Sequence, residues 1–183
     1  MDLEIIRSKR KTFEIQIKKD RVIVRVPFYA AKKDIDTFIA RHSEWIDRQT
    51  AKLGEARRER ENVKKLTEKE IADLYEKAKK VIPERVAYYA PTIGVKYGRI
   101  SIRKQKTRWG SCSAKGNLSF NCLLMLAPCE VTDSVVVHEL CHIKEMNHSK
   151  KFYDEVLKVF PSYKEQRNWL KINGEKLLAM ADL

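Results

Sequence analysis

Alternating apolar and charged residues near the start of the chain predict two β-strands. Residues 12–17 and 21–26 alternate in this way, and residues 18–20 between them are expected to form the turn of a hairpin. Residues 32–53 carry apolar side chains at helical spacing, which predicts an amphipathic helix. The mostly charged segment 55–65 lacks an apolar face, so we expect a solvated helix extension or a linker there.

A second helix and a second group of strands follow this segment. Thr67 and Glu70 have the spacing of a capping box, which predicts a helix that ends before Pro91 and is kinked or split at Pro83. Gly116 suits a turn between strands because glycine readily adopts a positive φ. Short alternating segments predict the strands themselves, at residues 99–103, 108–112 and 117–125.

The last third of the chain has the pattern of a buried helix followed by two amphipathic helices. The segment 130–146 opens with β-branched valines, which form helices poorly unless burial stabilises them, so this helix is expected to be central. Ser149 can cap the next helix, and Ser162 with Glu165 has the spacing of another capping box. Residues 173–174, Asn-Gly, are expected to interrupt the last helix.

The central helix carries the motif H-E-x-x-H, formed by His138, Glu139 and His142. Two histidines four residues apart differ by about 40° around a helix, so both rings project from one face and can bind one zinc ion. Glu139 lies about 100° from His138, beside such an ion and not on it, where a carboxylate can take a proton from water. The pattern therefore predicts a zinc site with Glu139 as general base.

A third histidine, His148, follows six residues after His142. On a continuous helix it would point about 240° away, so the helix must end near residues 146–147, where Asn147 tolerates a left-handed turn. Three histidines with a fourth position open to water are typical of a catalytic zinc site. The remaining histidine, His42, lies among charged residues and is interpreted as a surface residue.

Composition limits the setting and the partners. No apolar stretch is long enough to span a bilayer and no signal-peptide pattern opens the chain, so we expect a cytoplasmic protein without a membrane partner. The four cysteines form no C-x-x-C pair and are expected to be free thiols, with Cys141 in the core.

All of the net charge of +13 lies in residues 1–130. This basic part either attracts a polyanion, such as nucleic acid or a nucleotide, or is a solvated lysine-rich surface.

Three motifs together carry a resemblance to a known family. They are R-W-G-S-C-S at residues 108–113, V-V-V-H-E-L-C-H at residues 135–142, and N-H-S-x-x-F at residues 147–152. With the N-terminal strands included, nearly the whole chain resembles the YgjP-like metallopeptidases, relatives of the SprT-like zinc proteases. The ligand spacing equals that of metzincins, but Glu145 stands where metzincins have glycine, so that family is not assigned.

The resemblance implies an α+β, zincin-like fold with a small, mostly antiparallel sheet packed on the central HExxH helix. It also implies a single domain over residues 1–183, with an N-terminal hairpin and helix in 1–65 and the catalytic core in 66–183. In zincins an extended peptide pairs with an edge strand beside the site, and the segment 117–125 is the candidate here.

The resemblance also implies roles for individual residues. His138, His142 and His148 are the implied zinc ligands, and Glu139 is the implied base. Arg108, Asn121 and Tyr153 are candidate substrate contacts. Tyr153, Tyr163 and Arg167 are candidate donors to an anionic intermediate.

The expected function is zinc-dependent hydrolysis of a peptide or protein substrate. Two alternatives remain open. The same site could hydrolyse a nucleoside triphosphate, as a UTP-type pyrophosphatase, although the chain has neither a Walker loop nor a carboxylate cluster for Mg²⁺. The chain could also be a nucleic-acid-associated protease or binding module that its basic N-terminal half recruits.

Overall fold

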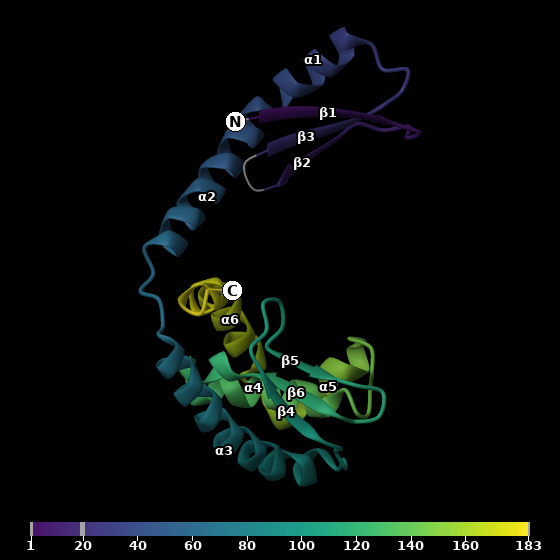
Figure 1. The fold of residues 1–183 in the computed structure, drawn as a ribbon. Coiled ribbons are helices and arrows are strands. Elements are labelled where there is room, and N and C mark those ends of the chain that lie inside the picture. The colour runs from purple at the N-terminus through teal and green to yellow at the C-terminus, as the bar shows by residue number, and fades with distance from the viewer. Residues whose placement is uncertain (1, 19–20, 183) are drawn as a thin grey trace. The chain divides into compact units, whose positions relative to one another are not determined.

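The structure is a computed structural model that describes residues 2–18 and 21–182, shown in Figure 1. The chain divides into two compact units, Met1–Asn62 (unit 1) and Val63–Leu183 (unit 2). This division falls three residues before the boundary expected at residue 65. In the described residues, two small sheets and six α-helices give a mixed α+β protein. No described helix combines the length and the apolar character needed to cross a membrane.

Unit 1 contains a three-stranded sheet with β3 (Arg21–Pro27) in the centre. β3 runs antiparallel to β2 (Glu14–Lys18), which confirms the predicted hairpin. On its other side β3 runs parallel to β1 (Asp2–Ser8), a strand that was not predicted. The β1–β3 pairing joins residues far apart along the chain, and local alternation does not encode such a contact.

Two helices, α1 (Lys32–Arg41) and α2 (Ser43–Glu61), replace the single helix predicted at residues 32–53. The chain leaves helical geometry at His42, whose ring nitrogen Nδ1 lies 2.8 Å from the carbonyl oxygen of Phe38. This contact occupies a carbonyl that a helix end leaves free. α2 continues to Glu61, so most of the charged segment 55–65 is a helix extension. The buried core cluster of unit 1 consists of Val22, Val24, Val26, Ala30 and Ile35.

Unit 2 begins with the long helix α3 (Glu68–Ile93). Its predicted capping box is confirmed: the Glu70 backbone N–H donates to the Thr67 hydroxyl at 3.2 Å, and the Thr67 backbone N–H donates to the Glu70 carboxylate at 2.8 Å. The expected break at Pro83 and the expected end before Pro91 were wrong, because α3 runs through both prolines. Burial of its apolar face outweighs the two lost hydrogen bonds; the residues of that face are Ala78, Ile82, Val86, Ala90 and Ile93.

The sheet of unit 2 is mixed, and the expectation of a mostly antiparallel sheet was wrong. β6 (Leu118–Asn121) lies between β4 (Ile100–Arg103) and β5 (Gly110–Cys112), parallel to β4 and antiparallel to β5. The parallel pair arises because the chain crosses from β4 to the far edge before the hairpin returns it to the centre. Gly116 forms the turn of that hairpin with φ 71°, as predicted. β6 is shorter than predicted because the 3₁₀ helix η1 (Cys122–Leu126) follows it.

Helix α4 (Cys129–Cys141) lies at the centre of unit 2, where it packs against α3, α5 (Lys150–Val159), α6 (Tyr163–Met180) and β5. Ten of its 13 residues are buried, including all four valines, which confirms the expected central position. The Ser149 hydroxyl caps α5 by accepting from the Phe152 N–H at 3.3 Å.

Helix α6 departs from the prediction at both of its marked positions. Ser162 makes no side-chain cap, so the expected capping box with Glu165 does not form. The helix also continues through Asn173 and Gly174, where an interruption was expected. Gly174 serves packing instead: a Cβ there would lie 3.2 Å from Cζ2 of Trp109, so only glycine lets that ring approach the helix.

An ion pair joins α4 to α3. The carboxylate of Asp133, which is 7% exposed, accepts from Arg85 Nε at 2.6 Å and from Arg85 Nη2 at 2.5 Å. The hydroxyl of Tyr89 donates to the same carboxylate at 3.1 Å. Because a buried carboxylate without its cation is strongly destabilising, this bidentate pair fixes the position of α4.

We predict that Arg85→Met destabilises unit 2 by about 2–3 kcal/mol, because Asp133 stays buried without its cation. The expected loss of stability is smaller than for a fully buried ion pair because the Arg85 side chain is 36% exposed. Lys79→Met is the matched control, since Lys79 also lies on α3 but pairs with Glu76 at the surface. Chemical denaturation measures both variants, and equal losses of stability would contradict a special role for the Arg85–Asp133 pair.

Candidate metal centre

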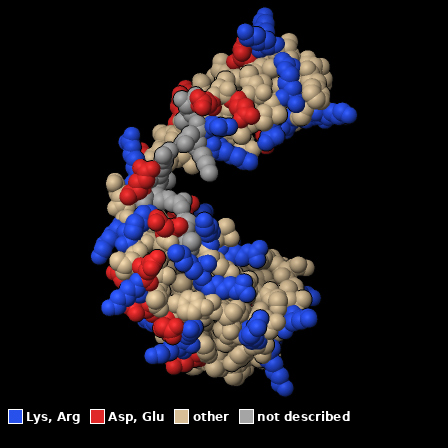
Figure 2. Space-filling view, viewed as in Figure 1, with Lys and Arg blue, Asp and Glu red and all other residues tan. Residues whose placement is uncertain are grey.

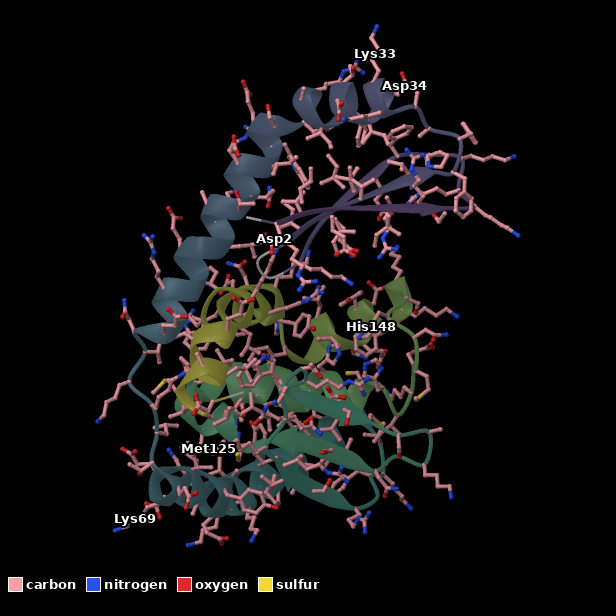
Figure 3. The ribbon with its side chains drawn as sticks, turned by 45° about the horizontal axis from the view of Figure 1, so that its top comes forward. Asp2, Lys33, Asp34, Lys69, Met125 and His148 are labelled. Carbon is pink, nitrogen blue, oxygen red and sulfur yellow. The ribbon has the colours of Figure 1, made fainter. Side chains whose placement is uncertain are left out.

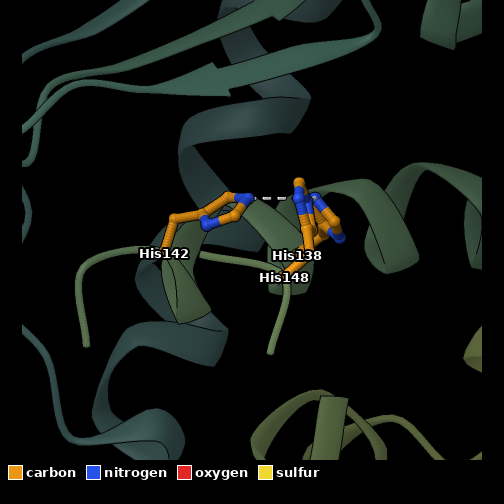
Figure 4. A group of neighbouring side chains, drawn as sticks. All are labelled: His138, His142 and His148. Atoms are coloured by element: carbon orange, nitrogen blue, oxygen red, sulfur yellow. Dashed lines mark hydrogen bonds between the residues drawn. The ribbon is translucent and has the colours of Figure 1, made fainter. Parts of the chain in front are cut away.

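Three histidines from two segments meet beside the end of α4. His138 lies in the last turn of α4, and His142 is its C-terminal cap residue. His148, which is labelled in Figure 3, lies in the connection to α5. Nε2 of His138 is 3.1 Å from Nε2 of His142 and 3.1 Å from Nε2 of His148 (Figure 4). One ring nitrogen from each residue lies within 4.8 Å of the others. The structure therefore brings together all three residues predicted as ligands.

The path of the chain between His142 and His148 differs from the expected one. α4 ends at Cys141, and the Glu145 backbone N–H still donates to the Cys141 carbonyl oxygen at 3.0 Å. Among the described non-glycine residues only Asp182 has a positive φ, so the left-handed turn expected at Asn147 is not used. Because the helix ends about five residues earlier than expected, an ordinary loop is long enough to bring His148 back.

The two distances of 3.1 Å from Nε2 of His138 are close to the spacing of ligand nitrogens around a small divalent cation. In a tetrahedral site with metal–nitrogen distances of 2.0–2.1 Å, ligand nitrogens are about 3.3–3.4 Å apart. The His142 Nδ1–H donates to the carbonyl oxygen of Glu145 at 3.1 Å, so Nε2 of the neutral ring carries a lone pair. A cation among the Nε2 atoms would satisfy such lone pairs, and three protein ligands would leave a fourth position open.

Two aromatic residues hold the imidazole rings in place. The ring of Phe152, which is fully buried, has its centroid 4.8, 4.4 and 5.0 Å from those of His138, His142 and His148. The hydroxyl of Tyr163 lies 2.8 Å from Nδ1 of His138. Sequence reasoning gave neither residue this role, although Phe152 was present in the N-H-S-x-x-F motif. Such contacts behind the ligands orient the rings.

Burial keeps the imidazoles of His138 and His142 uncharged. Burial, together with the charges of His142, His148 and Arg167, lowers the pKa of His138 to about 3. The pKa of His142 is also lowered, mainly by burial. Neutral imidazole is the form that binds a metal ion, so at neutral pH protons do not compete at these two residues.

Glu139 lies on α4 against the edge of the sheet. The residue is 6% exposed, and a Cβ on Gly110 of β5 would be 2.6 Å from both Cγ and Oε1 of Glu139. Burial raises the pKa of Glu139 to about 8, and the charge of Arg108 opposes that increase. A carboxyl group with a raised pKa beside three histidines is suited to proton transfer near neutral pH.

A pocket of about 200 Å³ opens beside His138 and Glu139. Its walls combine apolar side chains with two guanidinium groups. Arg108, a predicted substrate contact, and Arg167, a predicted donor, both line it. The lining residues are Arg108, Trp109, Gly110, Ser134, Val135, His138, Glu139, Tyr163, Arg167 and Leu170.

The structure places Asn121 away from this pocket. Its side chain is fully buried, donates to the carbonyl oxygens of Gln105 at 2.8 Å and Arg108 at 3.2 Å, and accepts from the Leu123 N–H at 3.2 Å. Asn121 therefore holds the loop before β5 and does not itself face a substrate, so the expected contact is corrected.

The strand proposed to bind an extended peptide is also corrected. β6, which occupies residues 118–121 of the candidate segment 117–125, has both edges paired, to β4 and to β5. A central strand offers no free backbone groups for β-augmentation. β5 is an edge strand, and its Gly110 borders Glu139.

Tyr153 lies beside His148, with the two rings stacked. Its ring centroid is 6.1 Å from that of His148, and Cζ of Arg167 is 6.0 Å from the Tyr153 centroid. Tyr153 does not line the pocket, but it joins the ligand loop to Arg167.

Comparison with known proteins identifies a family model described as "YgjP-like, metallopeptidase domain", which matches residues 11–72 and 57–173. Solved structures similar to the chain include the metallopeptidase zymogen abylysin of Pyrococcus abyssi, at 24% identity and a TM-score of 0.48, covering 51% of this chain and 94% of that one. Another is the metallopeptidase zymogen jannalysin of Methanocaldococcus jannaschii, at 26% identity and a TM-score of 0.44, covering 52% and 97%. The comparison with curated proteins gave no match.

We predict that Glu139→Gln removes a pH-dependent loss of stability in metal-free protein. The pKa of Glu139 is about 8 in the folded state against an ordinary 4.5. Between these values the folded protein keeps a proton that the unfolded chain has released, so stability falls as pH rises through this window. The variant cannot ionise there and should be more stable than the wild type by on the order of a few kcal/mol at pH 8.

Chemical denaturation at pH 5, 6.5 and 8 with a chelator present measures this difference. The lowered pKa of His138 also makes stability fall as pH falls below 6.5, because the unfolded chain then binds a proton that the folded protein does not. This contribution is the same in both proteins and cancels in the comparison. Parallel pH profiles for the two proteins would contradict a raised pKa at Glu139.

Proposed function

Because the chain belongs to the YgjP-like family of metallopeptidases, we propose that it is a zinc-dependent peptidase with Glu139 as general base. His138, His142 and His148 would hold the ion. The observation that carries the proposal is the convergence of three histidine nitrogens within 4.8 Å beside a carboxyl group that is 6% exposed. An all-nitrogen set of three ligands suits zinc better than Mg²⁺ or Ca²⁺, which prefer oxygen.

When bound, zinc acts as a Lewis acid that makes water more acidic and polarises a carbonyl group. The protein's part is to hold three neutral imidazoles at one point. The Glu145 carbonyl and the Tyr163 hydroxyl orient the rings of His142 and His138 from behind. These contacts give the site its geometry before any ligand arrives.

Glu139 would move the protons. Its raised pKa in the metal-free protein is set by burial, and a cation at the histidines would lower that pKa by favouring the carboxylate. The carboxylate would then take a proton from the attacking water and later return it to the leaving amine. Gly110 gives this side chain the room to lie beside the ligands.

An anionic oxygen that forms during peptide hydrolysis needs a hydrogen-bond donor. Of the three candidates from the sequence, Tyr163 already contacts His138 through its hydroxyl. We therefore assign the role to the neighbouring pair of Tyr153 and Arg167, which lie beside His148.

The substrate would bind in an extended form along β5. Edge strands pair with peptides through backbone hydrogen bonds, and β5 is the edge strand whose Gly110 borders Glu139. A peptide on this edge would run past the pocket lined by Arg108 and Trp109.

No contact in the described residues favours hydrolysis of a nucleoside triphosphate. The pocket of about 200 Å³ is smaller than the roughly 300–1,000 Å³ typical of sites for small-molecule ligands. Recruitment of nucleic acid by the basic N-terminal half remains a prediction from charge alone.

We predict one zinc ion per chain and loss of peptide hydrolysis by more than about 100-fold in Glu139→Gln, with zinc retained, because the base is removed and the ligands are not. His148→Ala should weaken zinc affinity more than about 100-fold, a larger effect than loss of a contact behind a ligand. His42→Ala, which removes the one histidine outside the site, is the control. Metal analysis accompanies assays against an unfolded protein and a nucleotide panel.

Either of two results would contradict this prediction. Zinc-loaded Glu139→Gln with undiminished turnover would remove the base assignment, and native protein that takes up no zinc would remove the metal site. Hydrolysis of nucleotides with every protein substrate left intact would replace the peptidase by the pyrophosphatase alternative.

We also predict that Gly110→Ala lowers kcat by about 100-fold and leaves zinc binding intact. The added methyl group would displace Glu139, and a misplacement of about 1 Å can cost a rate of this size. Gly54→Ala is the control because a Cβ there meets no atom within 4 Å. Full activity in Gly110→Ala would show that Glu139 does not depend on the room that this glycine leaves.

A further inference from the structure

The pocket beside the histidines contains two guanidinium groups, those of Arg108, which has no part in the proposed chemistry, and of Arg167, which is also the proposed donor to the anionic oxygen. Arg108 precedes β5 and lies close enough to Glu139 to oppose the rise of its pKa. Arg167 lies on α6, and its charge acts on His138 and Tyr163. The two guanidinium groups therefore border different parts of one pocket next to the reacting centre.

Neither guanidinium group forms an ion pair with any carboxylate whose side chain the structure describes, in residues 2–18, 21–55, 58 and 61–182. Both residues are exposed at the pocket. By contrast, Arg85 of the same unit is fully engaged by Asp133. Glu139 is the one acidic residue among the lining residues, and it forms no ion pair with either arginine. The two guanidinium groups therefore keep hydrogen-bond donors for a further carboxylate, which a guanidinium binds through two parallel hydrogen bonds.

Part of the remaining wall of the pocket, away from His138 and Glu139, is apolar and fits the stem of a side chain. Trp109, Val135 and Leu170 line it together with the two arginines. Its volume of about 200 Å³ suits one amino-acid side chain and is below the roughly 300 Å³ at which small-molecule sites begin. A glutamate side chain combines methylene groups for these walls with a carboxylate for the arginines.

The surface around the pocket has the same sign of charge. From Arg85 to Cys129 the chain contains eight Lys and Arg residues and no Asp or Glu. In Figure 2 the visible face of unit 2 over the strands shows mostly Lys and Arg, while Asp and Glu gather nearer to α3. A basic surface of this kind attracts acidic peptides and repels basic ones.

We propose that this pocket selects substrates that carry a carboxylate next to the scissile bond, with Arg108 and Arg167 as the residues that determine this specificity. The proposal rests on the peptidase function proposed above. The carboxylate belongs either to a Glu or Asp side chain or to the free C-terminus of a peptide, because both present the same group to the two guanidinium groups. A Lys or Arg at the same position would be disfavoured by like-charge repulsion.

The test uses the zinc-loaded full chain and peptides that differ only at the residues flanking the scissile bond. Each position carries Glu, Gln, Leu or Lys in turn, and one pair of peptides differs only in a free or amidated C-terminus. The variants are Arg108→Gln, Arg167→Gln and the double variant. Arg99→Gln is the matched control, because Arg99 is an exposed arginine of unit 2 that does not line the pocket.

The wild type is expected to cleave the Glu peptide with a kcat/KM about tenfold or more above that of the Gln peptide, the size of one charge-assisted hydrogen bond. The double variant should bring this ratio close to one, each single variant should fall between, and Arg99→Gln should keep the wild-type ratio. Binding of fluorescent Glu and Gln peptides to zinc-loaded Glu139→Gln gives the same comparison without turnover.

The outcomes separate this inference from the function on which it rests. Cleavage of the Glu and Gln peptides at equal rates, or an unchanged ratio in the double variant, would overturn the carboxylate specificity and leave the peptidase intact. Cleavage of no peptide by zinc-loaded protein would overturn the peptidase function itself. A preference for the free C-terminus without a preference for internal Glu would assign the carboxylate to the chain end.

Discussion

Helix α4 is buried along nearly its whole length, and the other parts of unit 2 depend on how that burial is achieved. Its valines pack into the core although they are weak helix formers. The buried Asp133 on the same helix is tied to α3 through Arg85, which fixes α4 against rotation. His138 and Glu139 leave the same rigid helix at its end, so their directions are set by core packing and not by the loops.

The same burial sets the protonation states at the site. Removing water from the imidazoles and from the carboxyl group disfavours the charged form of each, so it lowers the pKa of His138 and raises that of Glu139. The neutral rings of His138 and His142 hold their Nε2 atoms close together, and the protonated carboxyl group of Glu139 lies on the same helix. A divalent cation at this point would bind the lone pairs of the rings and favour the carboxylate form of Glu139. Under the proposed function, metal binding and activation of the base would therefore be coupled through one buried volume.

The sequence was informative wherever a local pattern carried the structure. The spacing of His138, Glu139 and His142 follows from helix geometry, and the Thr67–Glu70 box and the Gly116 turn are local as well. The order of the strands within each sheet could not be predicted from local patterns. The central place of β6 and the β1–β3 pairing depend on contacts between distant residues, which alternation along the chain does not encode. The predictions based on Pro83 and Pro91 were wrong for a related reason. The burial of one face of α3 depends on tertiary packing, and it outweighs the two missing hydrogen bonds.

The segment Arg108–Gly110 shows why a motif can be recognised before its roles are understood. Each residue acts through a partner far away in the chain: Arg108 lines the pocket, Trp109 packs on Gly174 of α6, and Gly110 leaves room for Glu139 of α4. The buried side chain of Asn121 holds the loop that carries these residues, because its amide group donates a hydrogen bond to the carbonyl oxygen of Arg108. A substitution at any of these positions would act on the base or the pocket without touching a histidine. The edge of the sheet thus borders the candidate metal centre, and under the proposed function the geometry of β5 would limit both proton transfer and substrate choice.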